Sequence, residues 1–255
     1  MRKILSLNNI TVDLTTEGAG PLVVLLPSAG RDSLDFDDLA ASLAREGYRV
    51  LRPQPRGVFG STGPMTGITL HDLARDVAVV IEEEGGGPAF VGGHAFGQWV
   101  ARMTAVDHPD LVRGVMLIAA AAKSIPAELS AGVDKCSDPA TPRDERLALL
   151  QKLFFAPGHD PSGWLEGWHL PARTCQRVAS AATGQAEWWG GGSALILDLQ
   201  AALDPFKPRE KRDELRDELG ERVTVEVIEG ASHALIPEQP AAVVAALVRW
   251  MGSVG

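Results

Sequence analysis

The feature that most constrains the fold is a five-residue turn, Gly-His-Ala-Phe-Gly at residues 93–97. It follows an apolar run at 88–92 and precedes a segment with helical spacing at 98–103. A strand that passes directly into a helix brings two backbones close together and forces the central residue toward positive φ. Glycines at both ends relieve that crowding, whereas Ala95 has no polar group that could use the strained position. The pattern predicts a strand, a tight turn centred on Ala95, and a helix.

With serine in place of Ala95, this turn would be the Gly-x-Ser-x-Gly motif that presents a nucleophilic hydroxyl between a strand and a helix. An alanine at a strained position is more readily explained as a serine that has lost its oxygen than as a residue selected for the turn. The alternative is an ordinary strand-to-helix turn of a parallel-sheet protein.

Composition limits the class of protein and its partners. Of the 255 residues, 45% are hydrophobic and 22% are charged, which is typical of a globular protein with one substantial core. The formal net charge is −9 and no Lys/Arg run occurs. Nucleic acids and anionic membranes attract concentrated positive charge, so we expect neither as a partner. A small neutral ligand is compatible with this composition, and the oligomeric state stays open, a homodimer included.

The ends and the cysteines indicate a compartment. The first nine residues contain two basic residues but too short an apolar stretch for a secretory signal. No later segment approaches the ~18 apolar residues of a membrane span. We therefore expect a cytoplasmic protein in which Cys136 and Cys175 are reduced thiols.

Short apolar runs with strand-forming residues alternate with segments of helical spacing. Strands are expected at 10–14, 21–26, 49–52, 89–92, 112–119, 194–199 and 223–228, the first two as an opening hairpin. Helices are expected at 35–46, 70–84, 96–108, 209–219 and 238–251. The alternation predicts an α/β fold with a mostly parallel sheet covered by helices.

One long segment, residues 122–192, interrupts this alternation. It contains several prolines and glycines, with helical pieces at 144–155 and 171–182. Because strand-like runs resume after it, we interpret it as an insertion rather than as an independent domain. The predicted organisation is a core of residues 1–121 and 193–255 with a helical cap insertion at 122–192.

Over essentially its whole length the chain resembles the α/β-hydrolase family, in particular its esterase, lactonase and haloperoxidase-like members. In that family the nucleophile, acid and histidine follow one another in chain order. Residues 229–240 resemble the loop after the last strand, Gly-x-x-His followed by Glu-x-Pro. The resemblance implies that His233 is the catalytic histidine, and a surface-loop histidine is the alternative.

The resemblance also implies an acid. Residues 204–208 resemble the family's Asp-x-x-x-Pro after the penultimate strand, which assigns the acid to Asp204 and leaves helix capping as its alternative role. Asp198 is the nearest competitor, but it lies inside an apolar run and is expected on a strand. The predicted catalytic set is Asp204, His233 and the nucleophile position at Ala95.

An oxyanion hole is the third element that the resemblance implies. The family usually has His-Gly-x after the third strand, whereas this chain has Leu-Pro-Ser-Ala-Gly at 26–30. Backbone N–H groups perform this role, so we expect the N–H groups of Ala29 and Phe96 to face the developing oxyanion. Ser28, beside them, is expected to contact the substrate.

The remaining candidates concern substrate binding. Four of the six tryptophans lie in the insertion, and Trp164 and Trp188 are our candidates for the pocket wall of an apolar or aromatic substrate. The alternative is that they form the core of the cap. Phe59 lies in a turn that resembles the family's Arg-Gly-x-Gly-x-Ser and is a further wall candidate, and His94 is expected beside the site. The histidines lack metal-ligand spacing, so neither a metal nor a cofactor is predicted.

An intact site of this kind hydrolyses carboxylic esters or lactones through an acyl-enzyme. With Ala95 the acyl-enzyme cannot form, so the sequence favours an inactivated Ser-to-Ala variant that still binds substrate. A natural non-catalytic binding or receptor protein is the alternative, and carbon–carbon bond hydrolysis by the same triad is a further one. The presence of both Asp204 and His233 favours the enzyme, since a decayed site has no reason to keep them.

Overall fold

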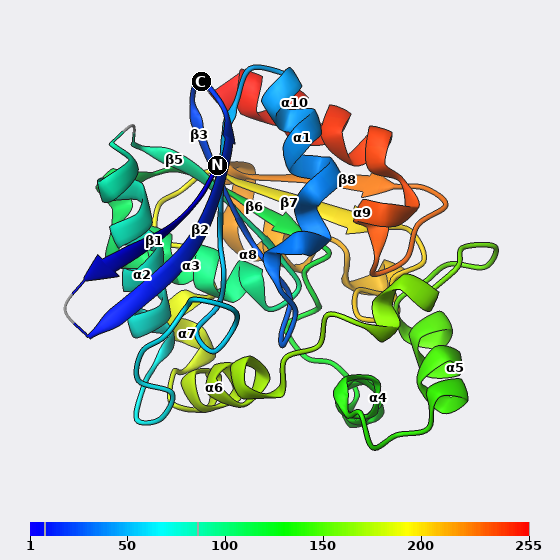
Figure 1. The fold of residues 1–255 in the computed structure, drawn as a ribbon. Helices are drawn as coiled ribbons and strands as arrows, with labels where there is room; N and C mark the ends of the chain where they lie inside the picture. The colour runs from blue at the N-terminus through cyan, green and yellow to red at the C-terminus, as the bar shows by residue number, and fades with distance from the viewer. Residues whose placement is uncertain (8, 86, 255) are drawn as a thin grey trace.

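An eight-stranded sheet forms the centre of the molecule in a computed structural model that describes residues 1–7, 9–85 and 87–254 (Figure 1). The strand order is β1-β2-β4-β3-β5-β6-β7-β8, antiparallel where β2 meets β1 and β4 and parallel elsewhere. The strands are β1 (Arg2–Leu7), β2 (Ile10–Gly18), β3 (Leu22–Leu26), β4 (Arg49–Pro53), β5 (Ala89–His94), β6 (Val112–Ile118), β7 (Ile196–Ala201) and β8 (Val223–Ile228). The α/β fold with a mostly parallel sheet is confirmed.

The expected opening hairpin between 10–14 and 21–26 is wrong. The hairpin partner of β2 is β1, and β3 pairs instead with β4 and β5. Edge strand β1 alternates exposed and half-buried residues and so gives no continuous apolar signal. Strand β3 is buried along its whole length and therefore lies between two neighbours.

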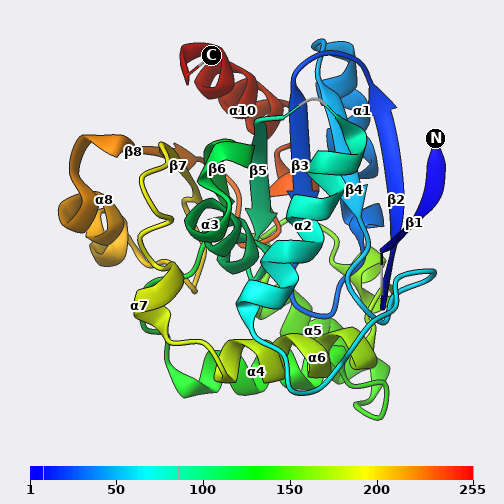
Figure 2. The ribbon, with the colours of Figure 1, turned by 90° about the vertical axis from the view of Figure 1, so that its left-hand side faces the viewer.

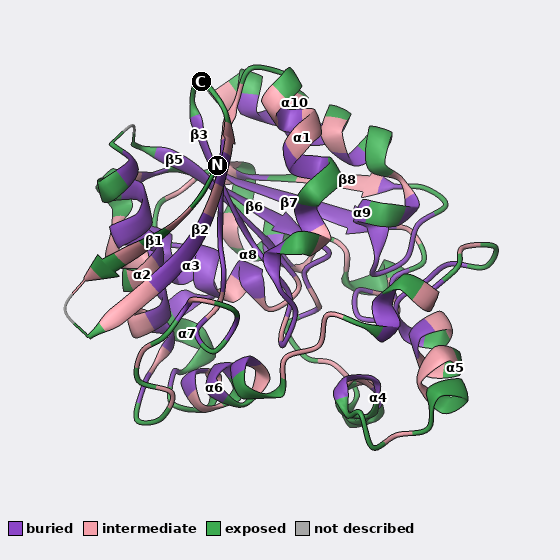
Figure 3. Ribbon diagram, viewed as in Figure 1, coloured by how far each residue is buried: buried purple, intermediate pink, exposed green. Residues whose placement is uncertain are grey.

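Helices cover both faces of the sheet (Figures 1 and 2). On one face α1 (Asp37–Arg45) packs with α10 (Pro240–Val254), and on the other α2 (Leu70–Glu84) packs with α3 (Gly97–Asp107). Each pair shares a separate apolar cluster with the sheet, and the central strands are buried (Figure 3). The shorter helices α8 (Glu214–Leu219) and α9 (Leu235–Glu238) follow β7 and β8. Helix α2 has the bounds that the sequence predicted, because a Thr69 capping box begins it and Gly85 at φ 62° ends it.

Four helices separate β6 from β7 and lie beyond the carboxyl edge of the sheet (Figures 1 and 2). They are α4 (Ala127–Ser137), α5 (Arg143–Leu153), α6 (Leu170–Ala181) and α7 (Gln185–Trp188). The sequence did not predict α4, which buries only three of its residues. An apolar cluster of the cap includes Phe206 and Ala234, so the cap packs on the loops after β7 and β8. Within the described ranges, every helix is too short or too polar to span a bilayer.

Candidate active site

The predicted catalytic and oxyanion residues follow four strands of the sheet, β3, β5, β7 and β8. Parallel strands end at one edge of a sheet, and ligands bind outside that carboxyl edge. A cavity of about 330 Å³ lies there, within the usual size range of small-molecule sites. The core contributes Ser28 and Ala29 after β3, Ala95 and Phe96 after β5, and His233 after β8 to its lining.

The turn after β5 has the conformation that the sequence predicted. Ala95 has φ 46°, and its N–H donates to the Ile118 carbonyl at 3.0 Å. A Cβ on Gly93 would lie 2.1 Å from the carbonyl carbon of Gly97, and a Cβ on Gly97 would lie 2.2 Å from the Leu26 oxygen. Only glycine fits at either position, and the turn therefore places the Ala95 side chain at the cavity.

Asp204 and His233 form a buried pair. His233 Nδ1 lies 2.9 Å from Asp204 Oδ2, and Asp204 Oδ1 accepts the Phe206 N–H at 2.8 Å. Since a carboxylate can only accept, Nδ1 donates this bond, and Nε2 is the other nitrogen of the ring. The competing acid, Asp198, lies within β7 with the Lys207 Nζ 3.7 Å away. The geometry brings Asp204, and not Asp198, to the histidine.

His94 holds the loop that carries His233. Its Nε2 donates to the His233 carbonyl at 2.8 Å, and the two imidazole rings lie 5.1 Å apart. Burial, with a smaller contribution from the neighbouring His233, lowers the pKa of His94 to about 3. His94 is therefore neutral at physiological pH and holds the loop rather than exchanging protons.

Two backbone N–H groups are available to an oxyanion. Within residues 1–7, 9–85 and 87–254 the N–H groups of Ala29 and Phe96 donate to no protein acceptor, and both residues line the cavity. The next residue, Gly30, is held by the cap on both sides of its backbone. Its N–H donates to Gln176 Oε1 at 2.7 Å, and its carbonyl accepts the His169 N–H at 2.7 Å. The cap thus fixes the loop that carries the first expected donor.

Further contacts bind the same loop to the cap. Arg31 donates to the Glu166 carbonyl at 2.5 Å and lies over the rings of Trp164 and Trp168, each 4.9 Å away. His169 Nε2 lies 2.7 Å from a carboxylate oxygen of Asp32. Loop and cap are consequently one hydrogen-bonded unit.

The turn at Ala95, the pair formed by Asp204 and His233, and the N–H groups of Ala29 and Phe96 lie at one edge of the sheet. Residues 23–247 match the alpha/beta hydrolase family. The chain belongs to this family.

Individual relatives match less of the chain. A 2-(acetamidomethylene)succinate hydrolase from Mesorhizobium japonicum is 30% identical over 112 residues, 44% of this chain and 40% of that protein. A zearalenone hydrolase from Bionectria ochroleuca is 28% identical over 166 residues, 63% of this chain and 59% of that protein. The chain therefore spans less than two thirds of each relative. A solved thermophilic esterase from Thermogutta terrifontis has a TM-score of 0.81 at 19% identity, covers 100% of this chain and 99% of its own, and shares the fold.

Four of the five predicted substrate-binding residues of this α/β hydrolase, His94 among them, lie outside the cavity lining. Trp164 belongs to the apolar cluster of the cap, and Trp188 is buried behind Trp99, on whose ring it stacks at 4.8 Å. Phe59 is 53% exposed and packs its edge on the His169 ring at 5.6 Å. The aromatic lining instead comes from Phe96, Trp99, Phe154 and Phe206.

Four residues of the lining were not predicted from the sequence. Arg173, Gln176 and Arg177 line the cavity from α6, and Trp99 lines it from α3. A signal was present, because the three α6 residues recur at helical spacing on a segment whose other face is apolar. Trp99 lies in the first turn of α3, next to the turn that carries Ala95.

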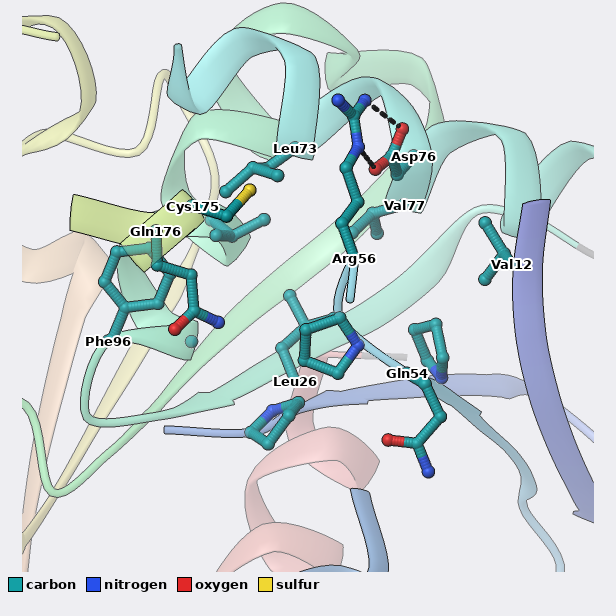
Figure 4. Close-up of a pocket in the computed structure, with 15 residues that line it drawn as sticks. Val12, Leu26, Gln54, Arg56, Leu73, Asp76, Val77, Phe96, Cys175 and Gln176 are labelled. Carbon is teal, nitrogen blue, oxygen red and sulfur yellow. Dashed lines mark hydrogen bonds and ion pairs between the residues drawn. The ribbon is translucent and has the colours of Figure 1, made fainter. Parts of the chain in front are cut away.

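A smaller cavity of about 60 Å³ lies behind Phe96 (Figure 4). It shares Phe96 and Gln176 with the larger cavity but is not lined by Ala95 or His233. The Arg56 guanidinium forms two bonds with the Asp76 carboxylate, at 2.6 and 2.8 Å, at its border. We assign this space to packing behind the oxyanion loop rather than to the reaction.

Metal-ligating side chains are not clustered in the parts of the chain that the structure describes. No group of three or more His, Cys, Asp or Glu side chains there could hold a metal ion.

Proposed function

We propose that the cavity binds a carboxylic ester or lactone with an apolar or aromatic part, and that Ala95 replaces the serine that would hydrolyse it. The observation that carries this proposal is the 2.9 Å contact between His233 and Asp204, with His233 on the same cavity as Ala95. Names of relatives such as zearalenone hydrolase and 2-(acetamidomethylene)succinate hydrolase support a hydrolytic ancestry.

A serine at position 95 would complete a nucleophilic mechanism. His233 Nε2 would accept the hydroxyl proton as the oxygen attacked the carbonyl carbon, while Asp204 stabilised the resulting imidazolium. The N–H groups of Ala29 and Phe96 would bind the oxyanion. His233 would then protonate the departing alcohol, and water activated by the same histidine would release the acid. With Ala95 the first bond cannot form, so the protein binds the ester without an acyl-enzyme.

The direct test is Ala95→Ser assayed beside the parent protein with p-nitrophenyl acetate and a longer-chain analogue. We expect kcat to rise by roughly a thousandfold or more, because removing a triad nucleophile costs up to about 10⁶ in a complete site. Ala95→Gly is the matched control, since it changes the same residue without supplying an oxygen. If Ala95→Ser is folded by circular dichroism and no faster than the parent, the protein is a non-catalytic binding protein.

A further inference from the structure

Helix α6 faces the cavity with a polar stripe. Arg173, Gln176, Arg177 and Ser180 line the cavity and recur at intervals of three and four residues. The opposite face carries the buried Ala172, Cys175 and Ala179, and the last two belong to the large apolar cluster under α2 and α3. The apolar face therefore fixes the rotation of α6 and keeps the two arginines on the cavity side.

The arginines of this stripe give the cavity lining a net positive charge, although the protein as a whole is acidic. The fixed charges among its described lining residues are Arg173, Arg177 and Asp134, two positive and one negative, whereas the chain has a net charge of −9. Both arginines share Asp134 Oδ1, since Arg173 Nη2 bonds to it and Arg177 Nη1 lies 3.7 Å away. Each guanidinium has five donors, so one shared carboxylate leaves most of them for another acceptor.

The two arginines differ in exposure. The Arg173 side chain is 12% exposed, and that of Arg177 is 71% exposed. A partly desolvated guanidinium binds an anion more strongly, and an exposed one attracts it from solution. Arg173 also lies over the oxyanion loop, because a Cβ on Gly30 would lie 2.9 Å from the Arg173 Cβ. An anion on Arg173 would thus be close to a carbonyl held at Ala29.

We propose that Arg173 and Arg177 form an anion subsite, and that the substrate is an ester whose acyl part carries a second, free carboxylate. This inference rests on the proposed function and narrows it. The carboxylate would displace Asp134 from part of the guanidinium surface, as bidentate pairing favours. The apolar side of the cavity, formed by Trp99, Phe154 and Phe206, would hold the rest of the molecule.

The test compares an anionic with a neutral ester of similar shape in the Ala95→Ser protein. We expect kcat/KM for mono-p-nitrophenyl glutarate to exceed that for p-nitrophenyl pentanoate about tenfold or more. Arg173→Gln and Arg177→Gln should each lower the value for the anionic ester by about tenfold, as expected for a lost charge-assisted bond, and should lower the value for the neutral ester much less. Arg143→Gln, an exposed cap arginine outside the lining, is the matched control and should change neither value.

Binding to the parent protein separates this inference from the proposed function. Glutarate titrated calorimetrically into the Ala95 protein should bind, more weakly in Arg173→Gln and more tightly in Asp134→Asn, which removes the competing carboxylate. If Ala95→Ser hydrolyses neither ester but glutarate binds in this way, the anion subsite stands and the proposed function fails. Equal kcat/KM for the two esters, equal losses for both in the arginine variants, or glutarate binding unchanged by them, would overturn the subsite.

Discussion

At the scale of single residues, the site depends on Ala95 and on the pair formed by Asp204 and His233, which lies at the same cavity. The turn at Ala95 is flagged by its two glycines, which the close approach of Gly97 to Leu26 requires. Asp198 lies within β7, as an aspartate inside an apolar run is expected to, whereas Asp204 lies in the loop that follows. Such residues could be predicted from the sequence because their roles depend on neighbours along the chain.

The low pKa of buried His94 leads to a prediction about how stability depends on pH. Its folded pKa of about 3 lies below the ordinary 6.5, so the unfolded chain binds the extra proton first as pH falls. The free energy of unfolding is therefore unaffected by this histidine above about pH 6.5. Below that pH it falls by about 1.4 kcal/mol per pH unit, down toward pH 3. In His94→Gln, whose amide can still donate to the His233 carbonyl, this loss should be absent.

The measurement is urea unfolding of both proteins at about pH 7.5 and about pH 5.5. We expect the parent to lose about 1.4 kcal/mol more of its free energy of unfolding than His94→Gln does. Carboxylates that titrate in this range are common to both proteins and cancel in the comparison. Parallel losses in the two would contradict the assignment of a neutral, buried His94.

At the scale of elements, the cap was the part that the sequence resolved least. Helix α6 was expected at 171–182 and lies at Leu170–Ala181, yet which of its side chains reach the cavity depends on packing against α2, far from it along the chain. The sequence predicted Trp164 and Trp188 in the pocket wall because large rings suit apolar ligands. Their large apolar surface is instead buried within the protein core. Composition alone cannot separate these two outcomes.

The contact between α6 and the oxyanion loop gives a prediction at this scale. In the Ala95→Ser background, Gln176→Leu removes the acceptor of the buried Gly30 N–H and loosens the neighbouring donor at Ala29. We expect kcat for p-nitrophenyl acetate to fall roughly tenfold, a fraction of the 10²–10³ lost when an oxyanion donor is removed outright, with a smaller change in KM. Gln176→Glu keeps an acceptor at the same place and should recover most of kcat. A rise in KM with kcat unchanged, or equal kcat in the two variants, would show that Gln176 does not position the loop.

At the scale of the whole molecule, the site exists because five strands of the sheet end at one edge and a cap closes over them. The parallel core could be predicted from alternating apolar runs and helical segments. The strand order could not, as the wrong opening hairpin shows, because the pairing of β3 with β5 joins residues far apart along the chain. The central claim is that this edge is a complete serine-hydrolase site apart from one oxygen at position 95.

A fluorophosphonate probe tests that claim most directly, because it bonds covalently to an activated serine, and donors of an oxyanion hole stabilise the charge that develops during this reaction. Parent, Ala95→Ser, and Ala95→Ser with Asp204→Asn would be treated together and the modified peptide located by mass spectrometry. We predict labelling at position 95 in Ala95→Ser, much slower labelling when Asp204 is also changed, and none in the parent. A folded Ala95→Ser protein that stays unlabelled at position 95 would contradict the account.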